Sequence, residues 1–405
     1  MTIAIIGAGP AGAMAALRLA RAGAPATLFD PSHPREKPCG GGLTGRALAL
    51  VADAVDIRSL PSVVVRSATI EPPVPARHGA VHAADVPLTG GDEGAALVIV
   101  SRMVFDRALL DAAVAAGARL LTEKVVDVCR RGSRFIVKTD RGEHAADCVI
   151  GADGPNSIVR KKLARPFSRG QLSVAAGYFV RGATSSAIVI KSMREQPGYL
   201  WSFPRPDHLA VGICTPAAER VSSALLRTQS HYWIRQHGFD RGTTLTPYAW
   251  PIPSVGDRDA MHMAVEGPGW MLVGDAAGLV DPLTREGIYY ALLSAQWAAD
   301  ALATASAERA ASLYASRVDH EIRPEIARAA RLSGPFFSPA FSSLLVRTLQ
   351  ESGAIREVFV DLVTGVQPYR GLRRRLLATR EWALAARSIR LLLTPRFGST
   401  MNNVG

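Results

Sequence analysis

The chain has 405 residues, of which 48% are hydrophobic and 20% charged, a composition that excludes a disordered or collagen-like protein. Its length exceeds one ordinary core of about 100–200 residues, so we expect two closely joined domains. The 47 Lys and Arg outnumber the 35 Asp and Glu to give a net charge of +12, and only six of these cations are lysines. Arginine-rich codon usage explains this excess as well as a surface for phosphate or anionic membrane does. No nucleic-acid-binding motif accompanies the charge, so we expect no nucleic-acid partner.

The cysteines indicate a reducing compartment. Cys39, Cys129, Cys148 and Cys214 are too scattered for a disulfide framework or a CxxC metal site, so we expect a cytoplasmic protein without a bound metal. The strand-like segment 2–6 follows Met1 directly, which predicts no signal peptide. No uninterrupted apolar run reaches 18 residues, which argues against a spanning helix. We therefore expect a soluble protein, or one peripheral to the inner face of the membrane.

Hydrophobic periodicity predicts α/β elements in three separated stretches, with an antiparallel sheet inserted between them. The expected strands are residues 3–6, 26–29, 119–121, 125–129, 135–139, 148–150, 187–191, 208–213 and 270–273. The expected helices are residues 10–22, 103–116, 217–237, one from Glu286, and further helices beyond Ala305 with breaks at Pro324, Gly334-Pro335, Gly353 and Pro368.

This order predicts an α/β fold, α+β overall. Its first part is a discontinuous Rossmann-like dinucleotide-binding domain, in residues 1–60, 98–165 and 255–305. An inserted antiparallel-sheet substrate domain is expected in residues 61–97 and 166–254, and a helical C-terminal region in residues 306–405.

A glycine-rich turn separates the first expected strand from the first helix. Gly7, Gly9 and Gly12 form a GxGxxG motif, in which the first glycine permits the turn, the second lets a pyrophosphate approach the backbone, and the third allows close packing of helix and strand. The phosphates would lie at a helix N-terminus, where free N–H groups favour anions. Asp30 ends the second strand, where a carboxylate can accept a hydrogen bond from a ribose hydroxyl.

Two later strands end in polar turns. Residues 149–154 end in Asp153-Gly154, and residues 270–278 run from a buried strand into Gly274-Asp275, where Asp275 is well placed to bond a polyol. A helix that starts near Gly287-Ile288 directs its N-terminus toward an electron-rich ring. Together with the glycine turn, this set is similar to FAD proteins of the para-hydroxybenzoate hydroxylase type, so the resemblance implies FAD as the cofactor.

Four stretches resemble the geranylgeranyl reductase family within that flavoprotein superfamily. They are Lys37-Pro38-Cys39-Gly40-Gly41-Gly42-Leu43, the segment 102–109, Pro197-Gly198-Tyr199-Leu200-Trp201-Ser202-Phe203-Pro204, and the segment 274–288. The first and third are the discriminating ones. The resemblance covers roughly residues 1–300 and implies an FAD-binding set: Gly7, Gly9, Ala11, Gly12, Asp30, Cys39, Gly40, Gly42, Arg102, Val126, Asp153, Gly274, Asp275, Gly287 and Ile288.

The resemblance also implies a substrate site. Tyr199, Trp201 and Phe203 share one face of a strand and would roof an apolar cavity over the flavin, although an ordinary aromatic core stripe has the same pattern. The family usually has Lys where Arg205 stands and Gly where Arg285 stands. Arg205 is therefore a candidate contact for a shifted substrate headgroup, and Arg285 is either a phosphate or carboxylate ligand or a surface charge.

The function implied is saturation of carbon–carbon double bonds in an isoprenoid substrate of the geranylgeranyl or polyprenyl type. Hydride would pass from flavin N5 to one alkene carbon and a proton to the other, with NAD(P)H or a ferredoxin as electron donor. The expected catalytic residues are Cys39 as acid or relay, Tyr199 as a second donor, and Trp201 as a wall that positions the chain.

Three alternatives remain at this stage. The main one is an FAD-dependent monooxygenase of an aromatic or polyketide-like substrate, because that class shares the scaffold. A flavin halogenase is disfavoured because no Lys lies between Lys37 and Lys124, where that family has its catalytic lysine. A non-catalytic flavoprotein that binds a lipid or quinone is the third.

Much of the positive charge lies near the C-terminus. Residues 369–397 contain eight Arg and only one acidic residue, Glu381, with leucines interleaved. An amphipathic basic helix of this kind can bind an anionic bilayer, or it can pack on the protein with its arginines in solvent. The candidate partners are therefore an apolar small molecule and, through these helices, a membrane surface.

Overall fold

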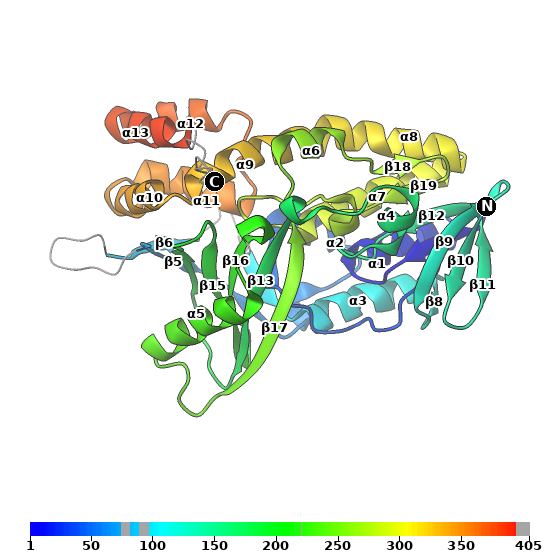
Figure 1. Cartoon of the computed structure of the whole chain (residues 1–405), viewed down its shortest axis with the longest axis horizontal. Helices are drawn as coiled ribbons and strands as arrows, with labels where there is room; N and C mark the ends of the chain where they lie inside the picture. Colours follow the sequence, from blue (N-terminus) through cyan, green and yellow to red (C-terminus); the bar gives the residue numbers. More distant parts are fainter. Residues whose placement is uncertain (74–81, 89–96, 220, 394–405) are drawn as a thin grey trace, which may run out of the picture.

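The computed structural model describes residues 1–73, 82–88, 97–219 and 221–393. Residues 74–81 and 89–96 of the expected substrate-domain segment 61–97, and the end of the basic stretch 369–397, lie outside these ranges. The expected fold class is confirmed: a parallel Rossmann-like sheet, further antiparallel sheets and a helical C-terminal region (Figure 1).

The Rossmann-like part is built on a six-stranded sheet with parallel strands except at one edge. Its order is β18 (Glu266–Gly267), β19 (Trp270–Leu272), β12 (Cys148–Gly151), β1 (Ile3–Ile6), β2 (Thr27–Phe29) and β8 (Arg119–Leu121), with β18 antiparallel. Every residue of β1 and β12 is buried, as expected of strands covered on both faces. Helix α1 (Pro10–Arg21) packs against both α3 (Arg102–Ala115) and α7 (Ile288–Thr304).

The second part is a seven-stranded, mainly antiparallel sheet. Its order is β17 (Thr244–Pro253), β13 (Leu172–Arg181), β16 (His208–Pro216), β15 (Tyr199–Pro204), β14 (Ile188–Ser192), β5 (Ser67–Glu71) and β6 (Ala84–Pro87). Helix α5 (Ser223–Gln236) covers one face, where Leu226 and Trp233 pack with Leu200 of β15. Trp201, the next residue of β15, packs on the opposite face with Phe179 and Tyr248. The alternation places successive side chains of β15 on opposite sides of the sheet.

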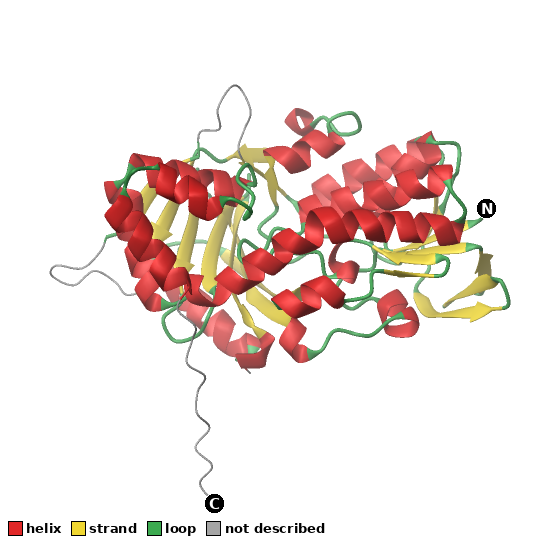
Figure 2. Cartoon of the chain, turned by 90° about the horizontal axis from the view of Figure 1, so that it is seen from above, coloured by secondary structure: helices red, strands yellow, loops and turns green. Residues whose placement is uncertain are grey.

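Two smaller sheets and three short helices complete the two parts. One three-stranded sheet is β3 (Gly42–Thr44), β7 (Leu97–Val100) and β4 (Ser62–Val64), and the other is β11 (Glu143–Ala146), β10 (Arg134–Thr139) and β9 (Val125–Arg131). The short helices are α2 (Gly45–Val51), α4 (Ile158–Leu163) and α6 (Asp257–His262). The seven-stranded sheet lies at one end of the molecule and the N-terminus at the other (Figure 2).

The C-terminal region is helical to the end of the described chain. Its helices are α8 (Ala307–Arg317), α9 (Arg323–Phe336), α10 (Pro339–Glu351), α11 (Gly353–Thr364), α12 (Leu372–Ala378) and α13 (Trp382–Leu393). The expected break at Pro368 falls between α11 and α12, and the one at Gly353 coincides with the start of α11. The break expected at Pro324 is wrong, whereas the one expected at Gly334-Pro335 comes directly after these residues, because α9 ends at Phe336. Pro324 occupies the first turn of α9, where no N–H is required, after a π-helical turn Val318–Ile322, and Pro335 lies in the last turn of α9.

A polar cluster fixes α5 to the substrate sheet. Glu71, at the end of β5, accepts hydrogen bonds from Lys191 Nζ at 3.2 Å and Trp233 Nε1 at 3.3 Å, and its other oxygen lies 3.1 Å from His237 Nε2. The hydrogen bond with Glu71 raises the pKa of His237 from its ordinary 6.5. His237 therefore binds its proton more tightly in the folded protein than in the unfolded chain.

This shift predicts a pH-dependent contribution to stability. A raised folded-state pKa adds stability that is fully present below the unfolded value of 6.5 and is lost as pH rises through the folded value. His237→Gln should lower the free energy of unfolding by up to about 1 kcal/mol at pH 5.5 and by less at pH 8.5. Urea unfolding at both pH values measures the difference, with His262→Gln, an exposed histidine of α6, as control. If His237→Gln lowered the free energy of unfolding equally at the two pH values, the raised pKa assigned to His237 would be wrong.

Candidate active site

The glycine turn between β1 and α1 forms one wall of a large cavity. Gly7 has φ +99°, and a Cβ there would lie 2.5 Å from the Ala152 carbonyl oxygen. A Cβ at Gly12 would lie 1.8 Å from the Gly7 oxygen, so this position requires glycine for helix–strand packing and does not line the cavity. Gly9 does line it and precedes α1 without any side-chain cap, which leaves the helix N-terminus open to an anion.

Asp30 follows β2 at the edge of the same cavity. Its carboxylate accepts hydrogen bonds from Ala8 N at 2.9 Å, His33 N at 2.9 Å and Ser32 N at 2.8 Å, and it lies 2.8 Å from His33 Nδ1. Burial alone would raise the pKa of Asp30, but these hydrogen bonds hold it well below its usual range. Asp30 is therefore a carboxylate that shapes the loop after β2. His33 was not predicted, because nothing in its sequence neighbourhood marks it.

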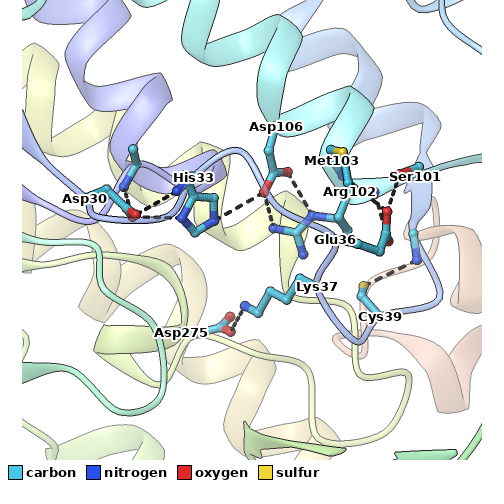
Figure 3. A network of polar contacts seen from close by, with 12 residues as sticks. Asp30, His33, Glu36, Lys37, Cys39, Ser101, Arg102, Met103, Asp106 and Asp275 are labelled. Carbon is cyan, nitrogen blue, oxygen red and sulfur yellow. Dashed lines mark hydrogen bonds and ion pairs between the residues drawn. The ribbon is translucent and has the colours of Figure 1, made fainter. Parts of the chain in front are cut away.

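A network of polar contacts extends from His33 to Arg102, and Cys39 lies nearby (Figure 3). His33 Nε2 lies 3.7 Å from Asp106, and Arg102 donates two hydrogen bonds of 2.8 Å to the Asp106 carboxylate. Arg102 is 4% exposed and lines the cavity. Its charge is balanced by the Asp106 carboxylate. Cys39 Sγ accepts a hydrogen bond from Gly41 N at 3.3 Å, which folds the Cys-Gly-Gly-Gly turn back on itself.

Arg205 lies outside the cavity, which contradicts its assignment to a substrate headgroup. It is 1% exposed, donates from Nη2 to the Cys39 carbonyl at 2.9 Å and lies 3.4 Å from Glu36. The hairpin after β15, closed by the bond from Arg205 N to His208 O, turns the side chain toward the glycine loop. Arg205 therefore fixes the backbone of the Cys39 loop from the substrate sheet.

The opposite wall comes from the ends of β12 and β19. Asp275 accepts a hydrogen bond from Lys37 Nζ at 3.2 Å, and Gly287 begins α7 without a side-chain cap. Asp153 accepts from Ile158 N at 2.6 Å, its second oxygen has no partner among the described residues, and burial raises its pKa to about 6. The expected residues that line the cavity here are Ala11, Asp153, Asp275, Gly287 and Ile288.

Two further expected residues lie elsewhere. Val126 is 49% exposed, and its neighbour Val125 lines the cavity instead, because successive residues of β9 point to opposite sides. Gly274 does not line the cavity either. A Cβ at Gly274 would lie 3.0 Å from Ala291, so this glycine allows the turn to pack on α7.

The turn 281–287 brings two charged side chains to the cavity. Arg285 has φ +62°, a left-handed conformation that is strained for a residue with a side chain, and donates to Ser254 Oγ. Glu286 accepts from Thr44 Oγ1 at 2.6 Å and from Arg46. Asp281 stabilises the turn through Leu283 N and Thr284 N, and it accepts a hydrogen bond of 2.8 Å from the Tyr369 hydroxyl. The C-terminal region thus supports the active-site turn, a role that the sequence did not indicate.

The aromatic side chains of β15 lie where the alternation predicts. Tyr199, Trp201 and Phe203 all line the cavity, and Phe203 lies against Gly40, where a Cβ would come within 3.1 Å of its ring. The Tyr199 hydroxyl donates to the Thr284 carbonyl at 3.2 Å and its ring stacks on Phe337. Burial raises the pKa of Tyr199 well above its usual range, so it stays protonated.

The cavity, of about 540 Å³, extends from the glycine turn to an apolar arm between the substrate sheet and the C-terminal helices. The arm is lined by aliphatic and aromatic side chains from the sheet region and the C-terminal helices: Ala68, Ile70, Leu88, Leu97, Ile188, Ile190, Phe336, Phe337, Leu345, Phe359 and Val363. The sequence predicted only that the aromatic side chains of β15 line the cavity. The arm itself was not predicted, because its residues are distributed over segments that are far apart in the sequence.

The first end of the cavity fits a flavin dinucleotide. Two uncapped helix N-termini, the glycine wall and the unpaired Asp153 oxygen provide the donors and acceptors that a pyrophosphate, a ribityl chain and a ring edge require. Among the described residues, no group of three His, Cys, Asp or Glu side chains is arranged to hold a metal ion.

Comparison with known proteins identifies the family. A family model described as an FAD binding domain matches residues 1–333. The geranylgeranyl diphosphate reductase of Rhodobacter capsulatus is 31% identical over 314 residues, which cover 73% of each chain. The chain belongs to the geranylgeranyl reductase family of FAD-dependent oxidoreductases. The menaquinone reductase of Mycobacterium tuberculosis, 30% identical over 393 residues, covers 89% of this chain and is itself covered to 91%.

Solved structures show the same fold. A geranylgeranyl bacteriochlorophyll reductase-like protein from Thermoplasma acidophilum superposes with a TM-score of 0.75 at 21% identity, over 93% of this chain and 99% of its own. A flavin-dependent brominase superposes with a TM-score of 0.68 at 18% identity, over 95% of this chain and 99% of its own. At such identities the likeness concerns the fold and leaves the reaction open. In the part of the chain that the structure describes, no helix is long and apolar enough to cross a membrane.

The position of Arg205 leads to a prediction for this reductase-family chain. Arg205→Met removes the donor to the Cys39 carbonyl and leaves that partly buried oxygen without this donor, so the free energy of unfolding should fall by about 1–3 kcal/mol and FAD should bind more weakly. Flavin fluorescence titration and urea unfolding measure the two effects. Arg181→Met, an exposed arginine at the end of β13, is the control. Unchanged FAD affinity together with a raised KM for substrate would restore the headgroup role.

Proposed function

We propose that the chain is an FAD-dependent reductase that saturates carbon–carbon double bonds of an isoprenoid substrate. The observation that carries this proposal is the apolar arm, which continues from the flavin end of the cavity between β5, β14 and the helices α9–α11. An arm lined by hydrocarbon and aromatic side chains suits a long unsaturated chain, which gains free energy by leaving water. The relatives named for geranylgeranyl diphosphate and menaquinone support the same substrate class, because both compounds carry isoprenoid chains.

FAD, once reduced by NAD(P)H or a ferredoxin, supplies the hydride when bound. Glycines 7 and 9, the N-termini of α1 and α7, and Asp30, Asp153 and Asp275 would hold the cofactor. Trp201 and Phe203 exclude water and fix the chain against the Gly40 turn. One alkene carbon accepts the hydride and its neighbour accepts a proton, so a donor must lie within the dry cavity and recover its proton from solvent afterwards.

Two groups at the junction of the cofactor end and the arm carry suitable protons. The Cys39 thiol lies in the turn that closes the flavin end, and we assign it the transfer to carbon. Tyr199 stays protonated, but its hydroxyl is directed to the Thr284 carbonyl, so we assign it the second place. The Arg285 guanidinium lies at the same junction and would bind a diphosphate or a carboxylate of the substrate head.

The reaction is tested with chemically reduced enzyme without oxygen. Geranylgeranyl diphosphate or menaquinone should gain mass in steps of two hydrogens, and the rate with Cys39→Ser should fall by about 100-fold. Tyr199→Phe keeps the ring and should have the smaller effect. Equal rates for wild type and Cys39→Ser would remove the role of Cys39. Substrate-dependent oxygen consumption with a hydroxylated product would replace the reductase by a monooxygenase.

The apolar arm should set the chain length that the enzyme accepts. Val363 lines the arm from α11, so Val363→Trp should lower kcat/KM for geranylgeranyl diphosphate at least about tenfold relative to the shorter geranyl diphosphate, with unchanged FAD affinity. Val114→Trp makes the same change on the exposed side of α3 and serves as the control. If both substrates lose activity to the same extent, the arm does not hold the chain.

A further inference from the structure

The last two described helices and the turns before them carry an exposed surface that the proposed reaction does not use. We define the basic surface as the exposed side chains of residues 366–387 with long apolar or guanidinium groups. They are Val366, Arg370, Arg373, Arg374, Leu377, Arg380, Trp382 and Arg387. Helices α12 and α13 lie on the outer side of α9–α11 (Figure 1).

Helix α12 has one side buried in the core and the other side exposed on the basic surface. Leu372 and Leu376 are buried with Ile355 and Val358 of α11. Arg373, Arg374 and Leu377 occupy the other side of the same helix and are exposed. The helix is therefore amphipathic in an unusual sense, because its solvent side carries both cations and a large aliphatic side chain.

The charge on this surface is not balanced by the protein. Arg375 is paired with Asp361, but for Arg370, Arg373, Arg374, Arg380 and Arg387 no carboxylate within the described ranges lies at ion-pair distance. Glu381 is the single acidic residue between positions 365 and 393. A group of unbalanced guanidinium groups attracts anionic ligands, above all phosphates.

Large apolar side chains are exposed in the same stretch of the chain. Val366 is 70% exposed, Trp382 62% and Leu377 40%, and all three fall within 17 consecutive positions. Water solvates such groups poorly, whereas an indole or a leucine beside arginines is well placed at the boundary between lipid headgroups and acyl chains. A soluble anion would use the arginines but would leave the tryptophan in water.

The basic surface lies close to the helices that line the apolar arm. Helices α12 and α13 pack on α9, α10 and α11, and these three helices line the apolar arm with Phe336, Leu345 and Phe359. We propose that the basic surface docks on an anionic lipid bilayer, with Trp382 and Leu377 inserted at the headgroup level and the arm directly beneath. The delivery of an isoprenoid chain from the bilayer into the arm rests on the proposed function, whereas the docking itself does not.

The test is flotation of the full chain with vesicles of phosphatidylcholine alone or mixed in equal parts with phosphatidylglycerol. The triple variant Arg373→Glu/Arg374→Glu/Trp382→Ala should lose at least about tenfold in partition to the anionic vesicles. The matched control Arg119→Glu/Arg309→Glu/Tyr232→Ala makes the same change in net charge and removes an equally exposed aromatic ring elsewhere, and it should bind as wild type does.

Each outcome decides the proposal. Preference of the wild type for anionic vesicles, lost only in the first variant, supports it. Equal losses in both variants would show a nonspecific effect of net charge, and absence of binding, or binding that ignores lipid charge, would also overturn it. Turnover of substrate dispersed in detergent should be the same for all three proteins. A chain that binds vesicles without any turnover would disprove the proposed reaction and leave the docking surface in place.

Discussion

The structure depends on the attachment of the loop 36–42 to both sheets. Arg205 reaches this loop from the substrate sheet and donates to the Cys39 carbonyl, while Glu36 accepts hydrogen bonds from Ser101 and Arg102 N at the start of α3 in the Rossmann-like part. The Cys39 turn is therefore bound to both parts through groups that are largely buried. Because the free energy lost on removing one partner of a buried pair is large, the two parts cannot separate without disrupting the turn between them.

A second constraint acts from the C-terminal side. The turn 281–287 holds Arg285 in a left-handed conformation, and the hydrogen bonds that Asp281 accepts from the turn and from Tyr369 offset that strain. The same turn presents the Thr284 carbonyl to Tyr199 and leads into α7. The helices after α8 are thus part of the site, since they support one of its walls and enclose its apolar arm.

Local patterns were sufficient for most of the fold. The glycine spacing located the turn after β1 because Gly7 and Gly12 meet steric demands that only neighbouring backbone imposes. Alternation along β15 similarly placed Tyr199, Trp201 and Phe203 on one face. The break expected at Pro324 was wrong because proline is tolerated in the first turn of a helix.

Long-range contacts could not be read in this way. Glu36 and Arg205 are 169 positions apart, and Tyr369 and Asp281 are 88 apart, so no spacing rule relates them. Arg205 was assigned to the substrate because it follows a motif strand, yet a hairpin bond directs it to the loop. The apolar arm is built from β5, β14, α10 and α11, none of which carries a recognisable motif of its own.

The two ends of the cavity differ in polarity, and this difference supports the positions of the proposed proton donors. The flavin end is polar through backbone N–H groups and carboxylates, whereas the arm consists of hydrocarbon and aromatic rings. Water that entered the arm would find few hydrogen-bond partners there, so in the proposed reduction we expect the proton for carbon to come from a side chain at the boundary. Cys39 and Tyr199 both occupy that boundary, one on the loop fixed by Arg205 and the other facing the turn fixed by Asp281. The two buried constraints of the fold are therefore also the constraints that position its candidate acids.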